Sequence, residues 1–184
     1  MVTTHIVVVP YDERWARDFE DIASEIRDAL GELALEIQHV GSTSVPGLSA
    51  KPIIDIDVVI KDDSAFDAVV RALQSIGYYH EGDLGIPGRE AFGYEGKAHL
   101  RKHHLYVCPQ DSPELKRHIA FRDYLRAHPD AAREYGRVKE EGAALHPDDI
   151  EGYIRHKSAF IESIVTVQSY ANAELAGGRR SLQK

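Results

Sequence analysis

The feature that most constrains the fold is an apolar run interrupted by two aspartates, IIDIDVVI from Ile53 to Ile60. The run is dense in β-branched residues, which favour a central strand. Successive side chains of a strand point to opposite faces, so Asp55 and Asp57 share one face while the intervening aliphatic residues point toward the core. The pattern therefore predicts a buried strand that carries two adjacent carboxylates on one face.

Two adjacent negative charges on such a strand are costly unless something compensates them. A hard divalent cation with oxygen ligands is the natural compensation, and Mg²⁺ is the leading candidate because it fills most of its positions with water and substrate phosphates. We therefore expect Asp55 and Asp57 to be metal ligands that take part in catalysis. An Asp-x-Asp pair alone is more often a pair of surface acids, so its neighbours matter.

The segment that precedes this strand, Gly41 to Pro52, is rich in Gly, Pro and Ser, which predicts a loop with one short helical turn. Gly41 and Ser42 offer backbone N–H groups and a hydroxyl where a phosphate can approach closely. We expect these two residues, with Thr43 and Ser44, to bind phosphate. Lys51 adds a cation between this loop and the acidic strand.

The spacing of these elements resembles a known signature. Gly-Ser followed after twelve residues by Asp-hydrophobic-Asp resembles the DNA polymerase β-like nucleotidyltransferase superfamily, and GSTSVPGLSAKPIIDIDVVI closely resembles the GrpB family within it. The opening VVVPYDERW, the segment HHLYV and the spacing of Tyr153, Lys157 and Phe160 resemble the same family. The resemblance implies an α/β (α+β) fold with a small mixed sheet flanked by helices, Mg²⁺-dependent nucleotidyl transfer, and a cytoplasmic bacterial or archaeal protein.

The chain departs from the superfamily at the third carboxylate, which active members usually carry on a later strand. The corresponding segment here, HHLYVC, contains no acid, and His104 or Tyr106 takes that position. Glu90 and Glu95 lie in a weakly patterned region, and nothing in their spacing brings them to the site. We expect His104 to be the third member, because a neutral imidazole can serve as general base.

The ten histidines of the chain raise an alternative metal site. His39, His99, His103, His104 and Cys108 could together hold a transition metal, although their spacing matches no structural zinc motif. The competing interpretation is that His103 points outward, His104 lies on the sheet face beside the carboxylates, and Cys108 is a buried small hydrophobe. We favour Mg²⁺ over a transition metal.

Two further basic residues are candidates for phosphate binding. Arg101, next to Lys102, precedes the HHLYVC segment and could reach a triphosphate, although exposed basic pairs are usually solvated. Lys157 lies one helical turn from Tyr153 on an otherwise apolar helix face, where it either extends to solvent or points into a site. We favour the second interpretation for Lys157.

Periodicity predicts the remaining elements. We expect short strands or a hairpin between Tyr78 and Lys102, and further strands and helices over ranges 6–9 (strand), 15–30 (helix), 33–40 (strand), 53–60 (strand), 64–76 (helix), 103–108 (strand), 112–128 (helix), 130–145 (helix) and 148–170 (helix). The C-terminal part is therefore expected to be helical. Residues 1–176 are expected to form a single domain, and residues 177–184 a disordered tail.

Composition limits the possible partners. The formal net charge of −8 argues against a broad nucleic-acid-binding surface, and the single cysteine argues for a cytoplasmic location. The apolar run at Ile6 is too short for a membrane span. The expected ligands are a nucleotide and a small-molecule acceptor of the nucleoside monophosphate, with oligomeric state open. The alternative is a non-catalytic module that binds a nucleotide or another anion without turnover.

Overall fold

The computed structural model describes the backbone of residues 5–178 and the side chains of residues 5–166. A five-stranded mixed sheet has the order β1-β2-β5-β4-β3, in which β2 and β5 are parallel and every other neighbouring pair is antiparallel. The strands are β1 (Glu36–Val40), β2 (Ile54–Ile60), β3 (Tyr78–Gly82), β4 (Glu90–Tyr94) and β5 (His103–Pro109). The helices are α1 (Arg14–Leu30), α2 (Phe66–Ser75), α3 (Pro113–Ala127), α4 (Pro129–Leu145) and α5 (Ile150–Gly178).

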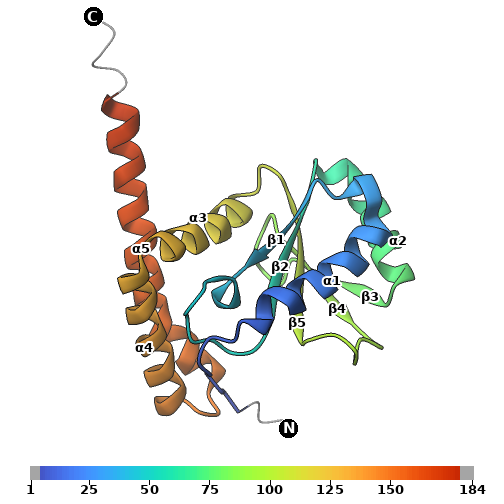
Figure 1. Ribbon diagram of the computed structural model, residues 1–184. Helices are drawn as coiled ribbons and strands as arrows, with labels where there is room; N and C mark the ends of the chain where they lie inside the picture. Colours follow the sequence, from blue (N-terminus) through green and yellow to red (C-terminus); the bar gives the residue numbers. More distant parts are fainter. Residues whose placement is uncertain (1–4, 179–184) are drawn as a thin grey trace, which may run out of the picture.

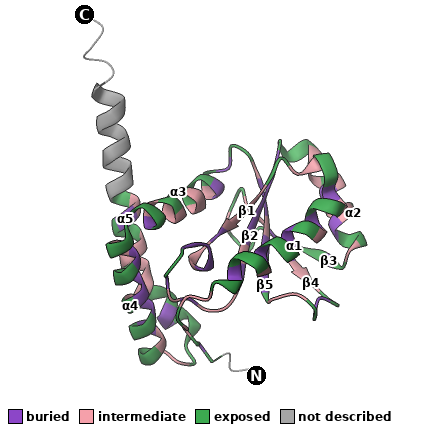
Figure 2. Ribbon diagram, in the orientation of Figure 1, coloured by how far each residue is buried: buried purple, intermediate pink, exposed green. Residues whose placement is uncertain are grey.

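Helices α1 and α2 cover one face of the sheet, and α3, α4 and α5 lie on the other side (Figure 1). The first face carries the main core. The apolar stripe of α1 packs there against the inward side chains of β2, which are fully buried (Figure 2). The alternation along β2 thus places Ile54, Ile56 and Val58 in this core, as its sequence predicts, and turns Asp55 and Asp57 toward the C-terminal helices.

The C-terminal helices are held against the sheet by two smaller apolar clusters. Val59, Cys108 and Leu115 join β2, β5 and α3, and burial raises the pKa of the Cys108 thiol to about 12. Val45 and Leu48, from the loop before β2, pack against residues of α3 and α4. These contacts fix the positions of α3 and α4 relative to Asp55 and Asp57.

Helix α4 forms in spite of two glycines, one of which marks a close approach to α5. A Cβ at Gly142 would lie 2.9 Å from His156 Cδ2, so a larger residue would displace the His156 ring. Ser112 caps the N-terminus of α3, because its hydroxyl accepts a hydrogen bond from Leu115 N.

Two of the predicted strands differ from the observed structure. The expected strand at residues 6–9 is reduced to a single bridge between Val9 and Ala50, because Ile6 N donates to Pro147 O instead of joining the sheet. The strand expected from Leu33 begins at Glu36, since Gly31–Leu33 form a 3₁₀ turn. The loop after β1 contains the expected short helical turn, Ser42–Ser44. Of the expected tail, residues 179–184 lie outside the described residues.

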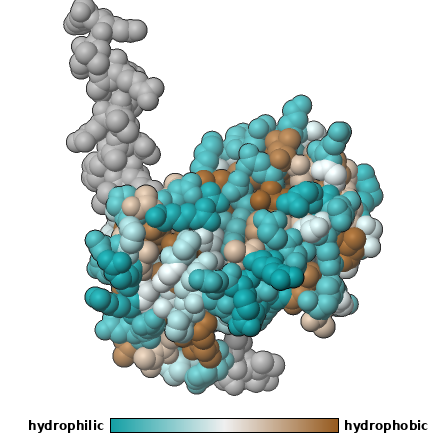
Figure 3. All heavy atoms as spheres, in the orientation of Figure 1, coloured by the Kyte–Doolittle hydropathy of each residue, from teal (hydrophilic) through white to brown (hydrophobic). Residues whose placement is uncertain are grey.

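No helix in the described part of the chain is both long and apolar enough to cross a membrane. On the face shown in Figure 3, hydrophobic side chains form separate patches among hydrophilic ones.

Candidate functional site

The parallel pairing of β2 with β5 builds the centre of the site. Its register places His104 opposite Asp55 and Tyr106 opposite Asp57. The two side chains of the first pair meet, with His104 Nδ1 2.9 Å from Asp55 Oδ1. His104 thus lies on the sheet face beside a carboxylate, as expected.

The second carboxylate is in a different environment. Asp57 has no exposed surface, and its Oδ2 lies 2.7 Å from Nδ1 of His118, a residue of α3. Burial opposes protonation of His118, but the hydrogen bond to Asp57 and the charges of Asp57 and Glu114 raise its pKa. The hydrogen bond from His118 to Asp57 therefore offers part of the compensation that the sequence predicted from a metal ion.

Gly41 brings the loop that we expect to bind phosphate against Asp55. Its φ of 69° lies in the left-handed region, and a Cβ there would be 2.9 Å from Asp55 Cγ. The next residues have different tasks: the Thr43 hydroxyl lies 3.0 Å from His39 Nε2, and Ser44 Oγ donates to Gly41 O at 2.5 Å. Thus Gly41, Ser42 and Thr43 line the cavities beside Asp55, whereas the Ser44 hydroxyl braces the loop.

The close approach at Gly41 yields a prediction. Gly41→Ala combines positive-φ strain of about 1 kcal/mol with displacement of Asp55, and we expect it to cost about 2–3 kcal/mol of unfolding free energy in urea denaturation. Gly47→Ala is the matched control, because Gly47 has a φ of 79° in the same loop but nothing within 4 Å of its Cβ position. Equal losses in the two variants would contradict the contact with Asp55.

Two adjacent cavities open around Asp55, with volumes of about 330 Å³ and 550 Å³. Both are lined by Ser42, Asp55, Arg89, Tyr106 and Lys157. The smaller is closed by aromatic and aliphatic residues of α3, α4 and α5, and the larger by Lys51, His104 and Lys139 among others. The sheet and the C-terminal helices together therefore form a cleft with Asp55 at its centre.

The cleft contains cations that the sequence did not connect with Asp55. Burial, and then the charge of Lys157, lower the pKa of Lys139, on α4, to about 7. Burial also lowers the pKa of Lys157, which the nearby Asp55 charge opposes. Lys157 therefore points into the cleft, as expected, and is joined there by Lys139 and by Arg89, whose guanidinium lies 4.1 Å from the centre of the Tyr106 ring.

Three buried side-chain atoms in the described residues have no hydrogen-bond partner: Asp57 Oδ1, Arg89 Nε and Lys139 Nζ. Arg89 and Lys139 line this cleft, and Asp57 contacts His118, which also lines it. Buried polar atoms are normally paired, so these three atoms are available to a ligand or to bound water. The carboxylate of Asp57 suits a bound cation, whereas Arg89 and Lys139 suit a bound anion.

The expected metal fits this donor set. Asp55 and Asp57 each keep one oxygen that is not bonded to a histidine, and Mg²⁺ accepts as few as two protein carboxylates. Among the described residues, no group of three or more His, Cys, Asp or Glu side chains is arranged to hold a metal ion. The remaining ligands would have to be water and substrate oxygens.

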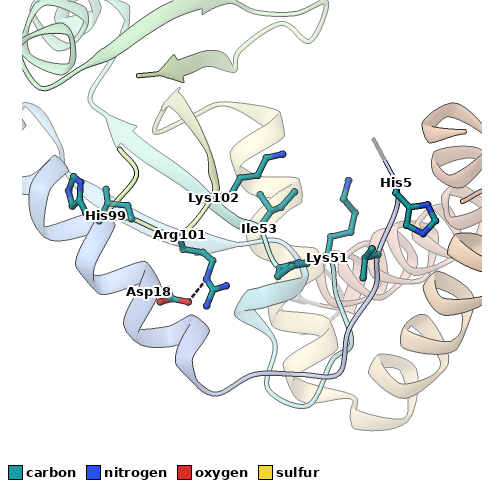
Figure 4. A pocket seen from close by; sticks show the side chains of 10 residues that line it. His5, Asp18, Lys51, Ile53, His99, Arg101 and Lys102 are labelled. Carbon is teal, nitrogen blue, oxygen red and sulfur yellow. Dashed lines mark hydrogen bonds and ion pairs between the residues drawn. The ribbon is translucent and has the colours of Figure 1, made fainter. Parts of the chain in front are cut away.

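Several other candidates lie away from this cleft. Arg101 Nε donates to Asp18, a residue of α1, at 2.8 Å. Arg101 lines a different cavity, together with Lys51 (Figure 4). Glu90 bonds His80, and its register opposite Val107 turns it toward the other face of the sheet. Arg101 and Glu90 are thus not brought to Asp55.

The histidines considered as a transition-metal site are engaged separately. One interpretation of the sequence had His103 pointing outward, but this residue is buried. Its Nε2 lies 2.8 Å from the Tyr78 hydroxyl. His99 lies 2.5 Å from Glu25, and His39 stacks on Phe19. Burial lowers the pKa of His39 to about 4, so its ring is neutral.

Sequence reasoning missed His118, Arg89 and Lys139. A signal existed for Lys139, which follows Ala132 and Tyr135 at helical spacing on the buried face of α4. The reasoning applied to Lys157, that a lysine is out of place on an apolar face, would have found it. Arg89 lies in a segment without periodicity, and His118 on a helix whose sequence shows no clear apolar face, so neither had a local signal.

Comparison with known proteins agrees with this architecture. A family model described as GrpB protein matches residues 5–166. The UPF0157 protein YqkA of Bacillus subtilis (strain 168) is 37% identical over 158 residues, which cover 86% of this chain but 46% of YqkA, so the chain spans about half of that relative.

Two solved structures relate the fold to a wider group. The crystal structure of the conserved protein GrpB from Enterococcus faecalis superposes with a TM-score of 0.76 at 38% identity, covering 86% of this chain and 94% of that one. The Cid1 poly(U) polymerase, solved with MgGTP bound, gives a TM-score of 0.50 at 11% identity, covering 72% and 45%. The fold thus resembles that of the nucleotidyltransferase Cid1.

Proposed function

The chain belongs to the GrpB family, and from this premise we propose that it is an Mg²⁺-dependent nucleotidyltransferase, which moves a nucleoside monophosphate from an NTP to a small acceptor. The proposal is supported by the fold shared with Cid1 and by the cleft around Asp55. The location expected from the sequence, the cytoplasm, agrees with such a role.

One observation carries the proposal: the unpartnered buried atoms Asp57 Oδ1, Arg89 Nε and Lys139 Nζ gather at one cleft. A lone anion would satisfy Arg89 and Lys139 but would leave Asp57 without a partner. A metal–polyphosphate pair satisfies all three, because the cation needs oxygen ligands and the phosphates need cationic donors.

The residues of the chain have distinct tasks in this scheme. Asp55 and Asp57 would hold Mg²⁺, which when bound polarises the phosphoryl centre and neutralises the leaving pyrophosphate. The backbone at Gly41 and Ser42 approaches the phosphates, and Arg89, Lys139 and Lys157 bind their oxygens. The apolar part of the smaller cavity, with Tyr106 and Phe121, offers rings on which a base can stack.

His104 is placed to act on the acceptor. If Nδ1–H donates to Asp55 Oδ1, the other ring nitrogen, Nε2, carries a lone pair. This nitrogen can accept the proton of an acceptor hydroxyl as the oxygen attacks the α-phosphorus and pyrophosphate leaves. His104 would thereby replace the missing third carboxylate.

One contact favours a second candidate, an anion-binding module without turnover. His118 Nδ1 lies 2.7 Å from Asp57 Oδ2. Against the effect of burial, this contact raises the pKa of His118, which is the arrangement expected where a histidine has taken over the charge compensation of a lost metal. In that case the cleft would bind nucleotide or another anion equally well with and without Mg²⁺.

The test is calorimetric titration of ATP, GTP, CTP and UTP into metal-free protein, with and without Mg²⁺. We expect Mg²⁺-dependent binding in the wild type and a loss of that dependence in Asp55→Asn. Asp130→Asn, which changes an exposed acid on α4, is the control. Binding that ignores Mg²⁺ supports the module, and no binding of any nucleotide rejects both candidates.

A further inference from the structure

A third cavity, of about 660 Å³, lies where β2 and β5 begin (Figure 4). Lys51 and Ile53 line it and also line the 550 Å³ cavity that contains Asp55 and His104. The two cavities therefore share a wall, and a molecule bound at one can extend into the other.

Most charges around this third cavity are already paired. Arg101 donates to Asp18 at 2.8 Å, His99 lies 2.5 Å from Glu25, and His5 lies 3.1 Å from Asp148. Lys51 and Lys102 are different: within residues 5–166, neither makes an ion pair. Two lysines that make no ion pair thus face a cavity in a chain whose net charge is −8.

The fold holds these two lysines together. Lys51 precedes β2 and Lys102 precedes β5, and these parallel neighbours start in register, with Ile54 opposite His103. Figure 4 shows both ammonium groups directed to the same side, away from Arg101. Burial, and then the repulsive charge of Lys102, lower the pKa of Lys51, and the charge of Asp55 opposes this shift.

We propose that Lys51 and Lys102 bind a phosphate group of the second substrate, so that the acceptor is a small phosphorylated molecule with a free hydroxyl. A phosphate between the lysines removes their repulsion and gains charge-assisted hydrogen bonds from both. The identification of this ligand as an acceptor, though not the phosphate binding itself, rests on the nucleotidyltransferase function proposed above.

The position of the lysines relative to His104 supports an acceptor. Lys102 lies two residues before His104, and extended chain advances about 3.3 Å per residue, which separates the two positions by about 7 Å. A molecule whose phosphate is held by the lysines can therefore place a hydroxyl a few bonds away beside His104. Arg89, Lys139 and Lys157 do not line the third cavity, and the nucleotide would lie with them in the cleft around Asp55.

The proposal is tested by titrating inorganic phosphate into metal-free protein at low ionic strength, followed by ³¹P line broadening. Lys51→Met and Lys102→Met remove one charge each. Lys61→Met is the matched control, because Lys61 is an exposed lysine at the opposite end of β2. We expect about tenfold weaker binding in each of the first two variants and no change in the control.

A second phosphate titration, at saturating Mg²⁺-ATP, shows whether the lysines bind a phosphate of a second substrate or the polyphosphate of the nucleotide. We expect phosphate to remain bound when ATP is present. Displacement of phosphate by ATP would show that the lysines hold the nucleotide's own polyphosphate, and it would overturn the proposal. Absent phosphate binding, or equal binding in all variants, would overturn it as well.

If the protein is not a nucleotidyltransferase, these titrations give a different result. In that case ATP does not bind at all, while phosphate binding still depends on Lys51 and Lys102. The anion site then stands, and its ligand is not the acceptor of this reaction.

Discussion

Replacing Asp57 with asparagine is expected to lower pyrophosphate release from NTP by about 10³-fold or more, because metal-assisted charge stabilisation contributes several kcal/mol to such transition states. Water can serve as the acceptor in this assay, giving a nucleoside monophosphate and pyrophosphate. The measurement is pyrophosphate release by purified protein with Mg²⁺, starting with the nucleotide that binds best.

The asparagine keeps the size of the side chain and an oxygen that can accept from His118, so the variant should fold. Its circular dichroism in the absence of metal should match that of the wild type. Asp63→Asn is the matched control, since Asp63 is an exposed acid just beyond the same strand. Equal pyrophosphate release by wild type and Asp57→Asn would sink the catalytic role, and a wild type with no release under any condition would favour the binding module.

The second large effect is expected at Lys139. Its side chain is about 2% exposed, its amine has no partner, and burial lowers its pKa from 10.5 to about 7. Lys139→Met should therefore raise the unfolding free energy by about 2–4 kcal/mol at pH 6, because an apolar side chain of similar length removes the cost of burying the charge.

The pH dependence has a definite sign. Between pH 7 and 10.5 the unfolded chain binds a proton at Lys139 that the folded chain does not, so wild-type stability rises with pH across this window. The advantage of Lys139→Met should be largest below pH 7 and should shrink toward pH 10.5. Urea unfolding at several pH values measures it, with Arg137→Met, an exposed position on the same helix, as control.

The same change should weaken nucleotide binding. Only the charged form of Lys139 attracts phosphate, so wild-type affinity should fall as pH rises above 7, by up to about tenfold per pH unit. Lys139→Met should bind at least about tenfold more weakly at pH 6 and lose this pH dependence. Unchanged affinity in the variant would remove Lys139 from the site. Greater stability with poorer binding is the pattern expected of a residue kept for function.

The fold was largely predictable, because its elements have strong local patterns. The stripe of α1 and the alternation along β2 each follow from a period in the sequence, and the structure confirms them. The expected strand at residues 6–9 was wrong because four apolar residues do not specify a partner. Ile6 instead bonds to Pro147, which lies far away in the sequence.

The sequence by itself determined the acidic centre of this protein. Strand alternation places Asp55 and Asp57 on one face, because the directions of successive side chains depend on the local backbone alone. The close approach of Gly41 to Asp55 is instead a contact between separate segments, which the tertiary structure shows. The tertiary structure alone decided what surrounds that centre. His118, Arg89 and Lys139 come from α3, the segment before β4, and α4, and they meet there because the apolar contacts of Val45, Leu48 and Leu115 orient the helices. Such packing depends on contacts between distant segments, for which a single sequence carries no local signal.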